Sequence, residues 1–291
     1  MAIPKLASYP LPTPDTFPAN KVKWTLEPSR AVLLIHDMQA YFTAFYGEDS
    51  PLVAALIERI GRVRDWCHAQ GIPVVYTAQP TEQSPQDRAL LNDMWGPGLT
   101  TADPALQDVV APLAPARNDT VLVKWRYSAF QRSHLEDLMK EWRRDQLLIC
   151  GVYANIGCMV TATDAFMRDI QPFFIGDALG DFSEEEHRLA LRYVATRCGS
   201  VIGYQAVIGE AATRFDQAWL LGQLEPYLDA EDDLPEGPDN LMDYGLDSVQ
   251  VMTLVSAWQR QGLNVSFAEL AGQPTLDGWL KIIASKQASA A

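Results

Sequence analysis

The chain has 291 residues, of which 48% are hydrophobic and 21% charged, and its formal net charge at pH 7 is −14. No apolar run approaches the ~20 residues that a membrane-spanning helix needs, so no membrane partner is expected. The acidic balance argues against a nucleic-acid partner, because phosphate binding requires clustered Lys and Arg. The length exceeds one average domain and predicts a large unit of about 200 residues plus a small one.

The sequence also indicates where the protein works and how its cysteines are used. Residues 1–6 contain neither a long apolar core nor a small-residue cleavage site, so the cytoplasm is the expected location. The cysteines form no Cys-x-x-Cys pair and have no neighbouring histidines at zinc-ligand spacing, so we expect packed, reduced thiols and no metal requirement. They are Cys67, Cys150, Cys158 and Cys198.

Short apolar runs alternate with helical patterns along the first 204 residues. The runs lie at residues 31–36, 72–77, 121–123, 147–150 and 173–176, and a sixth is expected at 200–203. The helical patterns cover residues 52–70, 133–144, 158–169 and 184–198. Continuous apolar runs are typical of strands buried on both faces, and their alternation with helices indicates parallel connections. The sequence therefore predicts an α/β domain with a doubly wound, mostly parallel six-stranded sheet.

Polar or glycine-containing segments follow four of these runs. Asp37 follows the first, Gln79 the second, Lys124 the third and residues 151–153 the fourth. Ligands bind at the carboxyl ends of the strands in doubly wound sheets. An Asp or a Lys at one such position is more often a cap or a surface charge, but the joint pattern predicts a single crevice.

The last 87 residues form a separate acidic module. From residue 205 onward, four Lys and Arg stand against thirteen Asp and Glu, a balance of −9 that leaves −5 for the first 204 residues. Helical patterns cover residues 215–228, 248–261 and 276–284, with a short apolar turn at 267–270, which predicts a small all-α, four-helix domain. We place the two domains at residues 1–205 and 215–288, with a linker at 206–214.

The second domain contains the motif Gly245-Leu246-Asp247-Ser248 at the start of a predicted amphipathic helix. This motif resembles the site at which carrier proteins take a covalent 4'-phosphopantetheine arm, which makes Ser248 the expected attachment point. The motif is short, but the acidic residues between 229 and 243 strengthen it because they can steer a basic transferase. Such a serine performs no chemistry itself, so any catalysis is expected in the first domain.

The crevice residues carry a resemblance to the isochorismatase-like hydrolase superfamily. It rests on Leu34-Ile35-His36-Asp37-Met38-Gln39, on Lys124 and on the turn at residues 151–158. In the amidase branch an Asp, a Lys and a nucleophilic Cys form a triad, and the nucleophile position here is Gly157. Cys158 comes one residue later, which turns its side chain by about 100° on a helix. A thiol mechanism is therefore disfavoured.

The closer resemblance is to the isochorismatases proper that are fused to an aryl carrier domain in catechol siderophore pathways. It covers nearly the whole chain, including residues 1–5, 88–98, 124–130 and 164–167. The family implies hydrolysis of the vinyl ether of isochorismate to 2,3-dihydro-2,3-dihydroxybenzoate and pyruvate, without a metal. Asn155 is a departure, since relatives usually have His at that position.

The resemblance also implies roles for the crevice residues. Asp37 is the expected acid that protonates the methylene carbon of the vinyl ether, which requires its pKa to be raised by burial and by the carboxylates of the substrate. An ammonium beside Asp37 would lower its pKa, so Lys124 is expected chiefly to contact the anionic groups and oxygens of the substrate, which neutralise it on binding. Backbone amides near Gly157 are expected to hold a substrate oxygen. The remaining expected substrate contacts, polar groups and ring walls together, are Phe42, Gln79, Arg88, Trp95, Tyr153 and Asn155.

The histidines are expected to stay outside this chemistry. His36 alternates with Asp37 along a strand, so its side chain is expected to point away from the crevice. The other three, His68, His134 and His187, fall on helical patterns and are expected on helix surfaces.

The carrier resemblance implies partners. These are a phosphopantetheinyl transferase, a 2,3-dihydroxybenzoate-adenylating enzyme and the condensation domain of a nonribosomal peptide synthetase. Met252, Phe267 and Ala271 are the expected docking residues, and the alternative that all three belong to the core stays open. Relatives are commonly oligomeric, so a homodimer is expected.

Two other functions stay open from the sequence. One is a Cys-dependent amidohydrolase such as a nicotinamidase, which the glycine at position 157 disfavours. The other is a carrier protein whose first domain is an inactive scaffold, which the crevice residues Asp37, Gln79, Arg88 and Lys124 disfavour.

Overall fold

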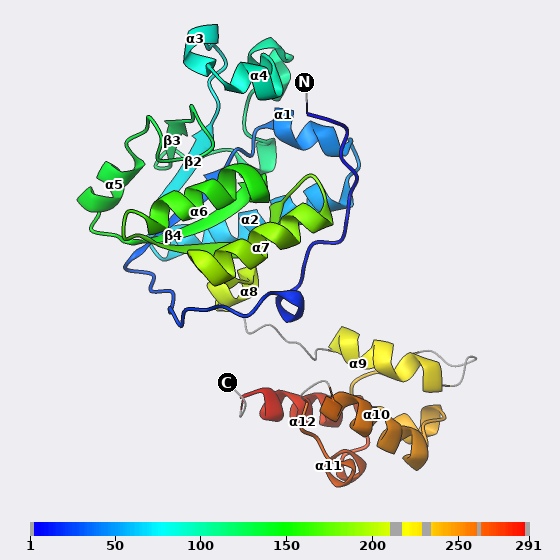
Figure 1. Ribbon diagram of the computed structural model, residues 1–291. Helices are drawn as coiled ribbons and strands as arrows, with labels where there is room; N and C mark the ends of the chain where they lie inside the picture. The colour runs from blue at the N-terminus through cyan, green and yellow to red at the C-terminus, as the bar shows by residue number, and fades with distance from the viewer. Residues whose placement is uncertain (1–2, 210–216, 229–233, 261–262, 289–291) are drawn as a thin grey trace. The chain divides into compact units, whose positions relative to one another are not determined.

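The computed structural model describes residues 3–209, 217–228, 234–260 and 263–288 and forms two compact units, Met1–Ala211 and Ala212–Ala291. The first unit contains a sheet of six parallel strands in the order β3-β2-β1-β4-β5-β6 (Figure 1). This order confirms the predicted doubly wound sheet. The strands are β1 (Ala31–His36), β2 (Val74–Ala78), β3 (Thr120–Val123), β4 (Gln146–Val152), β5 (Gln171–Gly180) and β6 (Ser200–Ile202).

Helices cover both faces of the sheet, which is why the central strands are apolar throughout. On one face α2 (Pro51–Ala69) packs side chains such as Leu56 against Leu33 and Ile35 of β1. The opposite face, with Val32 and Leu34, is covered by α5 (Leu135–Glu141), α6 (Met159–Phe166) and α7 (Glu184–Arg197). Figure 1 shows α6 and α7 in front of the sheet and α2 behind it. Alternate residues of β1 therefore contribute to two separate cores.

The crevice lies where the strand order reverses, between β1 and β4. The connection from β1 leads to α1 (Ala40–Thr43) and α2, whereas β4 leads to α6 on the other face. The two strands approach closely there, since a Cβ on Gly151 would lie 2.2 Å from the carbonyl oxygen of His36. Gly151 also has a φ of 112°, a conformation that favours glycine. The reversal opens a binding site at the carboxyl ends of these strands.

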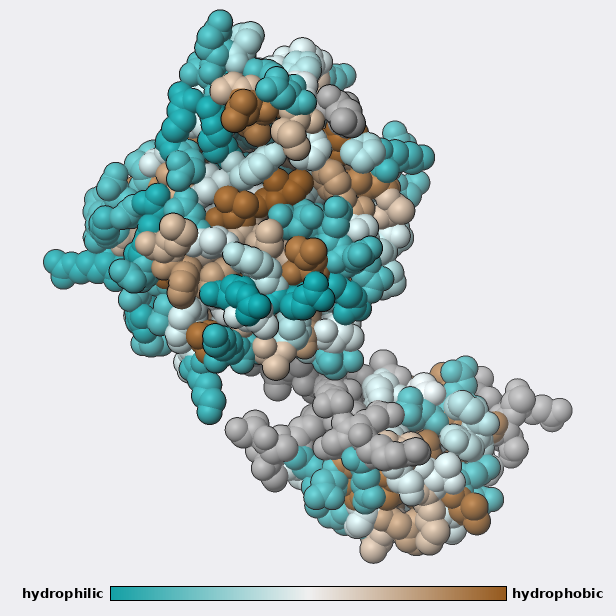
Figure 2. Space-filling model, in the orientation of Figure 1, coloured by the Kyte–Doolittle hydropathy of each residue, from teal (hydrophilic) through white to brown (hydrophobic). Residues whose placement is uncertain are grey.

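Two short helices, α3 (Pro85–Arg88) and α4 (Leu91–Trp95), follow β2, and the pattern of apolar runs gives no sign of them. Their residues border a surface groove with side chains from α6 and α7, including Leu90, Met94, Val160 and Met167. Hydrophobic residues gather on this face of the larger unit over α6 and near α4 (Figure 2). Met167 is 76% exposed and Leu90 is 78% exposed. This apolar face is therefore open in the isolated chain.

The second unit is helical, as predicted. Its helices are α9 (Gln217–Leu224), α10 (Ser248–Arg260), α11 (Phe267–Gly272) and α12 (Leu276–Ala288). Two fully buried tryptophans, Trp258 of α10 and Trp279 of α12, lie with ring centroids 5.9 Å apart at its centre. Val255 joins this core, one turn after the exposed Met252.

The boundary between the units remains a prediction, because residues 210–216 lie outside the described residues. In the first unit, α8 (Tyr204–Val207) extends the packed chain past residue 205, and Val207 is buried against the α2 side of the sheet. No helix in the described ranges has the length and apolarity to cross a membrane.

Candidate active site and carrier serine

One pocket at the carboxyl edge of the sheet collects nearly all the predicted crevice residues. Asn155 is the exception, since it is absent from the pocket lining. The predicted residues that line the pocket are Asp37, Phe42, Gln79, Arg88, Trp95, Lys124, Tyr153 and Gly157. They come from the ends of β1, β2, β3 and β4, from α1, from the helical turn after β4 and from the α3–α4 segment. The geometry thus assembles the site that the strand ends indicated.

Asp37 and Lys124 form a buried ion pair at the base of this pocket. Lys124 Nζ lies 2.7 Å from Asp37 Oδ2, and both side chains are about 95% buried, with 4% and 6% exposed. The hydroxyl of Thr77 donates to Asp37 Oδ1 at 2.8 Å. Thr77, which the crevice prediction did not include, therefore fixes the orientation of the carboxylate.

The pKa of Asp37 is not raised in this ligand-free site. Burial raises the pKa of Asp37, but the charge of Lys124, the neighbouring His36 and the hydrogen bonds from Lys124 and Thr77 together hold it below its ordinary value. A carboxylate that accepts hydrogen bonds from a cation and a hydroxyl is stabilised in its charged form. Asp37 is therefore ionised before a ligand binds.

The strand alternation predicted that His36 points away from the crevice, and this prediction is wrong. The strand ends at His36 and Asp37 has a φ of 48°, so the alternation breaks between the two residues and both line the pocket. The Nδ1–H of His36 donates to the Val152 carbonyl oxygen at 2.7 Å. Burial lowers the pKa of His36, outweighing the nearby Asp37, so the ring is neutral.

Cys158 faces away from the pocket into the core, as predicted. It is fully buried in the apolar cluster under α6 and α7. Burial raises the pKa of its thiol well above the ordinary value. A buried, protonated thiol is a poor nucleophile, which disfavours a thiol mechanism at this position.

Arg88 is a buried cation that faces the pocket. It is 5% exposed, and its Nε donates to the Gly96 carbonyl oxygen at 2.6 Å. Within the described ranges it makes no ion pair with a carboxylate. A buried guanidinium without an acidic partner is suited to bind an anionic ligand in a bidentate manner.

Aromatic side chains form the wall of the pocket. The hydroxyl of Tyr153 donates to the Phe42 carbonyl oxygen at 2.7 Å, and the Tyr153 ring meets Phe182 edge to face at 4.7 Å. Trp95 meets the same Phe182 at 5.9 Å and donates its Nε1–H to Tyr127. The prediction omitted Phe182 because it ended the fifth strand at residue 176. The strand runs to Gly180, so Phe182 stands just after a strand end, the signal that found Asp37, Gln79 and Lys124.

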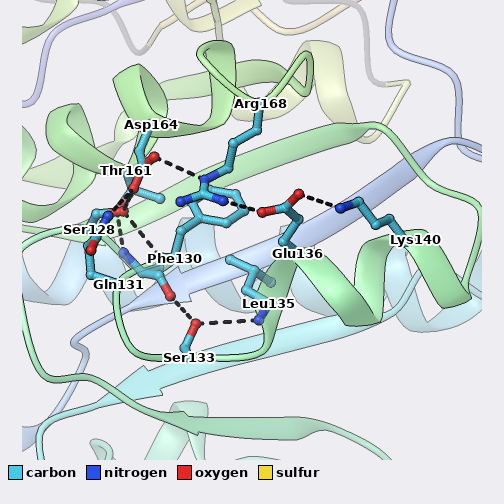
Figure 3. A network of polar contacts seen from close by, with 11 residues as sticks. Ser128, Phe130, Gln131, Ser133, Leu135, Glu136, Lys140, Thr161, Asp164 and Arg168 are labelled. Atoms are coloured by element: carbon cyan, nitrogen blue, oxygen red, sulfur yellow. Dashed lines mark hydrogen bonds and ion pairs between the residues drawn. The ribbon is translucent and has the colours of Figure 1, made fainter.

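The segment that carries pocket residues after Lys124 is fastened to α6. Asp164 of α6 accepts hydrogen bonds from Ser128 at 2.6 Å and from Gln131 at 3.2 Å, and pairs with Arg168 at 3.0 Å. Figure 3 shows this network continuing from Arg168 through Glu136 to Lys140 of α5. These contacts fix residues 128–133 and hence the neighbouring pocket residues 124–127.

Asn155 supports the pocket through its backbone. Its N–H donates to Asp181 Oδ2 at 2.7 Å, and the other carboxylate oxygen of Asp181 accepts the Phe182 N–H at 2.8 Å. Asp181 is fully buried, and burial raises its pKa to about 7. The sequence prediction missed Asp181, which joins the turn after β4 to the aromatic wall.

His187 is a second correction, since it does not lie on a helix surface. It is fully buried on α7, with Nε2 2.9 Å from the Gly176 carbonyl oxygen and Nδ1 3.0 Å from the Tyr9 hydroxyl. Burial lowers its pKa to about 4. His68, in contact with Asp119, and His134 are exposed as expected.

Replacement of Asp181 by asparagine is expected to change the stability of the larger unit in a pH-dependent way. As the pH rises from 4 to 7, the variant should gain stability relative to the wild type. The folded-state pKa of Asp181 is raised from 3.8 to about 7, so the wild type loses stability across this window by up to about 4 kcal/mol. The asparagine variant has no such loss. His187, whose pKa is lowered, makes both proteins more stable as the pH rises, so its contribution cancels when the two are compared. Hydrogen exchange of β4 and β5 amides at several pH values measures the difference. A difference that is constant with pH, as expected for the exposed Glu185→Gln control, contradicts the assignment.

The carrier motif has a specific geometry in the second unit. Gly245 has a φ of 94° and turns the chain, and Leu246 is buried as an anchor. Asp247 Oδ1 accepts the N–H groups of Val249 and Gln250, both at 2.8 Å, so it caps α10. Ser248, the first residue of α10, is exposed. The surrounding residues thus present the Ser248 hydroxyl to solvent, as attachment of an arm requires.

The expected docking residues are not all core residues. Met252 is 53% exposed on α10, next to Val249, which is 71% exposed. Ala271 is exposed on α11, whereas Phe267 is half-buried and packs against the core. The acidic residues at 229–233 lie outside the described residues. In the part of the chain that is described, no three His, Cys, Asp or Glu side chains gather to hold a metal ion.

Comparison with known proteins gives matches for both units. The isochorismatase domain family matches residues 31–206, and the phosphopantetheine attachment site family matches residues 218–283. The chain is 54% identical over 283 residues to enterobactin synthase component B of Escherichia coli (strain K12), covering 97% of this chain and 98% of that protein. It is 43% identical over 302 residues to the isochorismatase of Bacillus subtilis (strain 168), covering 98% and 96%.

A solved structure shows the same fold for the larger unit. A cysteine hydrolase from Pseudomonas syringae pv. phaseolicola superposes with a TM-score of 0.59 at 22% identity, covering 67% of this chain and 97% of its own.

Proposed function

The chain belongs to the isochorismatase family, and we propose that it is a bifunctional protein of catechol siderophore biosynthesis. The larger unit hydrolyses isochorismate to 2,3-dihydro-2,3-dihydroxybenzoate and pyruvate, and the smaller unit carries 2,3-dihydroxybenzoate as a phosphopantetheine thioester on Ser248. The observation that carries this proposal is the buried Asp37–Lys124 pair beside Gly157, in a pocket whose Arg88 pairs with no carboxylate among the described residues. The exposed, capped Ser248 on the same chain supports the carrier role.

The reaction needs a proton on carbon rather than a nucleophile on the enzyme. Protonation of the methylene carbon of the vinyl ether gives an oxocarbenium ion, water adds to this cation, and the resulting hemiketal collapses to pyruvate and the diol. A carboxylic acid at the right position is sufficient for the first step. Asp37 is the acid in our proposal, because it lines the pocket and is oriented by Thr77.

The charges of the site explain how an ionised Asp37 becomes an acid. The substrate carries two carboxylates, and the residues that line the pocket include three cations, Arg88, Lys124 and the half-buried Arg126, and one anion, Asp37. A substrate carboxylate bound close to the ionised Asp37 would raise the pKa of that carboxyl by like-charge repulsion. We infer that Asp37 takes up a proton when the substrate binds, and that Lys124 then contacts the substrate.

The walls of the pocket position the ring. Phe42, Trp95 and Tyr153 contribute apolar surface, and Gln79 contributes an amide for a hydroxyl or carboxylate group. Backbone amides of the turn near Gly157 can hold a substrate oxygen. Asn155 holds this turn through Asp181 and is expected to contact the substrate less directly than the sequence implied.

Replacement of Arg88 by lysine is expected to raise KM for isochorismate roughly 10- to 100-fold while kcat changes much less. Lysine keeps the charge but loses the planar fork, and a charge-assisted hydrogen bond contributes about 1.5–3 kcal/mol. Steady-state kinetics of pyruvate release measures both constants. The exposed Arg192→Lys of α7 is the matched control, and an unchanged KM in the Arg88 variant rules out this contact.

The carrier unit requires three partner enzymes that act on its arm. A phosphopantetheinyl transferase attaches the arm, an adenylating enzyme loads the aryl acid, and a condensation domain accepts it. The exposed Met252 and Ala271, with the half-buried Phe267 beside them, form the proposed docking surface. Tethering raises the effective concentration of the acyl group at a docked partner.

The proposal also includes a cytoplasmic location and a homodimer. The apolar groove between α4 and α6 supports self-association, since contiguous exposed apolar surface commonly marks an interface. Sedimentation velocity of the full chain measures the mass, and a monomer at micromolar concentration would refute the dimer.

The direct test of the hydrolase is incubation of the full chain with isochorismate, with pyruvate followed through lactate dehydrogenase. Pyruvate release that depends on the enzyme supports the proposal. If no pyruvate forms while Ser248 still accepts the arm, the larger unit acts on another substrate or serves as a scaffold.

A further inference from the structure

The side chain that Gly157 lacks would point directly at His36. A Cβ on Gly157 would lie 2.2 Å from Cε1 of the His36 ring, 2.7 Å from Nε2 and 3.2 Å from Nδ1. Carbon atoms that are not bonded normally stay about 3.5 Å or more apart. A side chain at position 157 and the imidazole at position 36 therefore compete for the same volume.

The imidazole has little freedom to leave this volume. His36 is 1% exposed, and its Nδ1–H donates to the Val152 carbonyl oxygen at 2.7 Å. Its backbone is held between β2 and β4 and lies against Gly151, where a Cβ would come within 2.2 Å of the His36 carbonyl oxygen. The ring is thus fixed by the sheet rather than by the pocket contents.

The contested volume adjoins the reactive pair. His36 Nδ1 is 3.8 Å from Asp37 Oδ2, and that oxygen is 2.7 Å from Lys124 Nζ. A carboxylate can activate a neighbouring thiol or hydroxyl by accepting its proton, and an ammonium favours the resulting thiolate. A nucleophilic side chain on residue 157 would therefore enter the range of both groups, if the imidazole were absent.

We propose that His36 and Gly157 form a mutually exclusive pair that sets the reaction class of the site. The imidazole fills the space that a nucleophilic side chain at position 157 would need, so the Asp37–Lys124 pair acts by proton transfer without a covalent enzyme intermediate. His36 is a specificity-determining residue in this view. The inference deepens the proposed function, since it concerns the same site.

The first test compares Gly157→Ala in two backgrounds, with His36 present and with His36→Ala. Pyruvate release and the free energy of unfolding of the full chain are both measured. With His36 present, Gly157→Ala should reduce kcat at least 100-fold or prevent stable folding. In the His36→Ala background the same change should reduce kcat less than about threefold and leave folding intact. Gly61→Ala, where a Cβ would meet only Leu113 at 3.8 Å, is the control and should have equal effects in both backgrounds.

An equal penalty for Gly157→Ala in both backgrounds, including a failure to fold in both, overturns the proposal. A harmless Gly157→Ala with His36 present overturns it as well. The unfolding measurement needs no substrate, so it decides the exclusion even if the wild type releases no pyruvate and the proposed function fails.

The second test introduces a thiol by Gly157→Cys in the same two backgrounds. Iodoacetamide alkylates a thiolate, which displaces iodide and forms a thioether, and peptide mass spectrometry separates position 157 from the four buried native cysteines. Alkylation at position 157 should be at least tenfold faster with His36→Ala than with His36 present. Adding Lys124→Met should slow it at pH 7, because the ammonium that favours the thiolate is gone. Equal rates in the two backgrounds, or no effect of Lys124→Met, contradict the proposal.

Discussion

Replacement of Asp37 by asparagine is expected to lower kcat for pyruvate release about 10²- to 10⁴-fold, the contribution of a positioned acid. Asparagine has the shape of the protonated acid and can keep the hydrogen bond from Thr77, but it has no acidic proton for the methylene carbon. The coupled lactate dehydrogenase assay measures the loss. The exposed Asp169→Asn is the control, because it removes a carboxylate from the same unit outside the pocket.

The same variant is expected to keep or lower KM. Without the charge of Asp37, the three lining cations Arg88, Lys124 and Arg126 face the dianionic substrate with no lining carboxylate beside them. A variant that turned over within tenfold of the wild type would eliminate Asp37 as the acid. A large rise in KM at unchanged kcat would instead make Asp37 a binding residue.

Substrate binding should also be coupled to proton uptake. The pKa of Asp37 lies below its ordinary value in the free enzyme, so the proton must come from solvent when the dianion binds. The kcat/KM, which reports on the free enzyme, should therefore fall as the pH rises through the neutral range. The sequence suggests that an ammonium beside Asp37 lowers its pKa, and the 2.7 Å contact between Asp37 and Lys124 provides that ammonium.

The strands could be predicted because a parallel sheet covered on both faces requires continuous apolar runs. The runs at residues 31–36 and 147–150 match β1 and most of β4, and their ends locate the pocket. The helices α3 and α4 were missed because each is too short, at four and five residues, to show a hydrophobic period. Their residues Arg88 and Trp95 were found through the family resemblance alone.

The two histidine errors have different physical causes. At His36 the alternation of strand side chains was extended past the end of the strand, where the φ of 48° at Asp37 ends it. At His187 the helical period was available, since Ala190, Leu191 and Val194 follow at spacings of three, four and seven and are buried on the same face. The prediction of an exposed His187 gave more weight to the polar side chain than to this helical spacing. The buried His187 finds partners in Tyr9 and Gly176, contacts that no local pattern reveals.

Replacement of Ser248 by alanine is expected to abolish attachment of the phosphopantetheine arm and to leave the hydrolase activity unchanged. The serine hydroxyl is the group that joins the phosphate of the arm, and alanine removes it while preserving the helix. Asp247 still caps α10 and Leu246 still anchors the turn, so the fold of the second unit should persist. Incubation with a phosphopantetheinyl transferase and coenzyme A, followed by intact-mass measurement, detects the arm. Ser256→Ala, on the exposed face of the same helix, should be modified like the wild type. Modification of the Ser248 variant would move the attachment site elsewhere, and a loss of pyruvate release in it would show that the two units depend on each other.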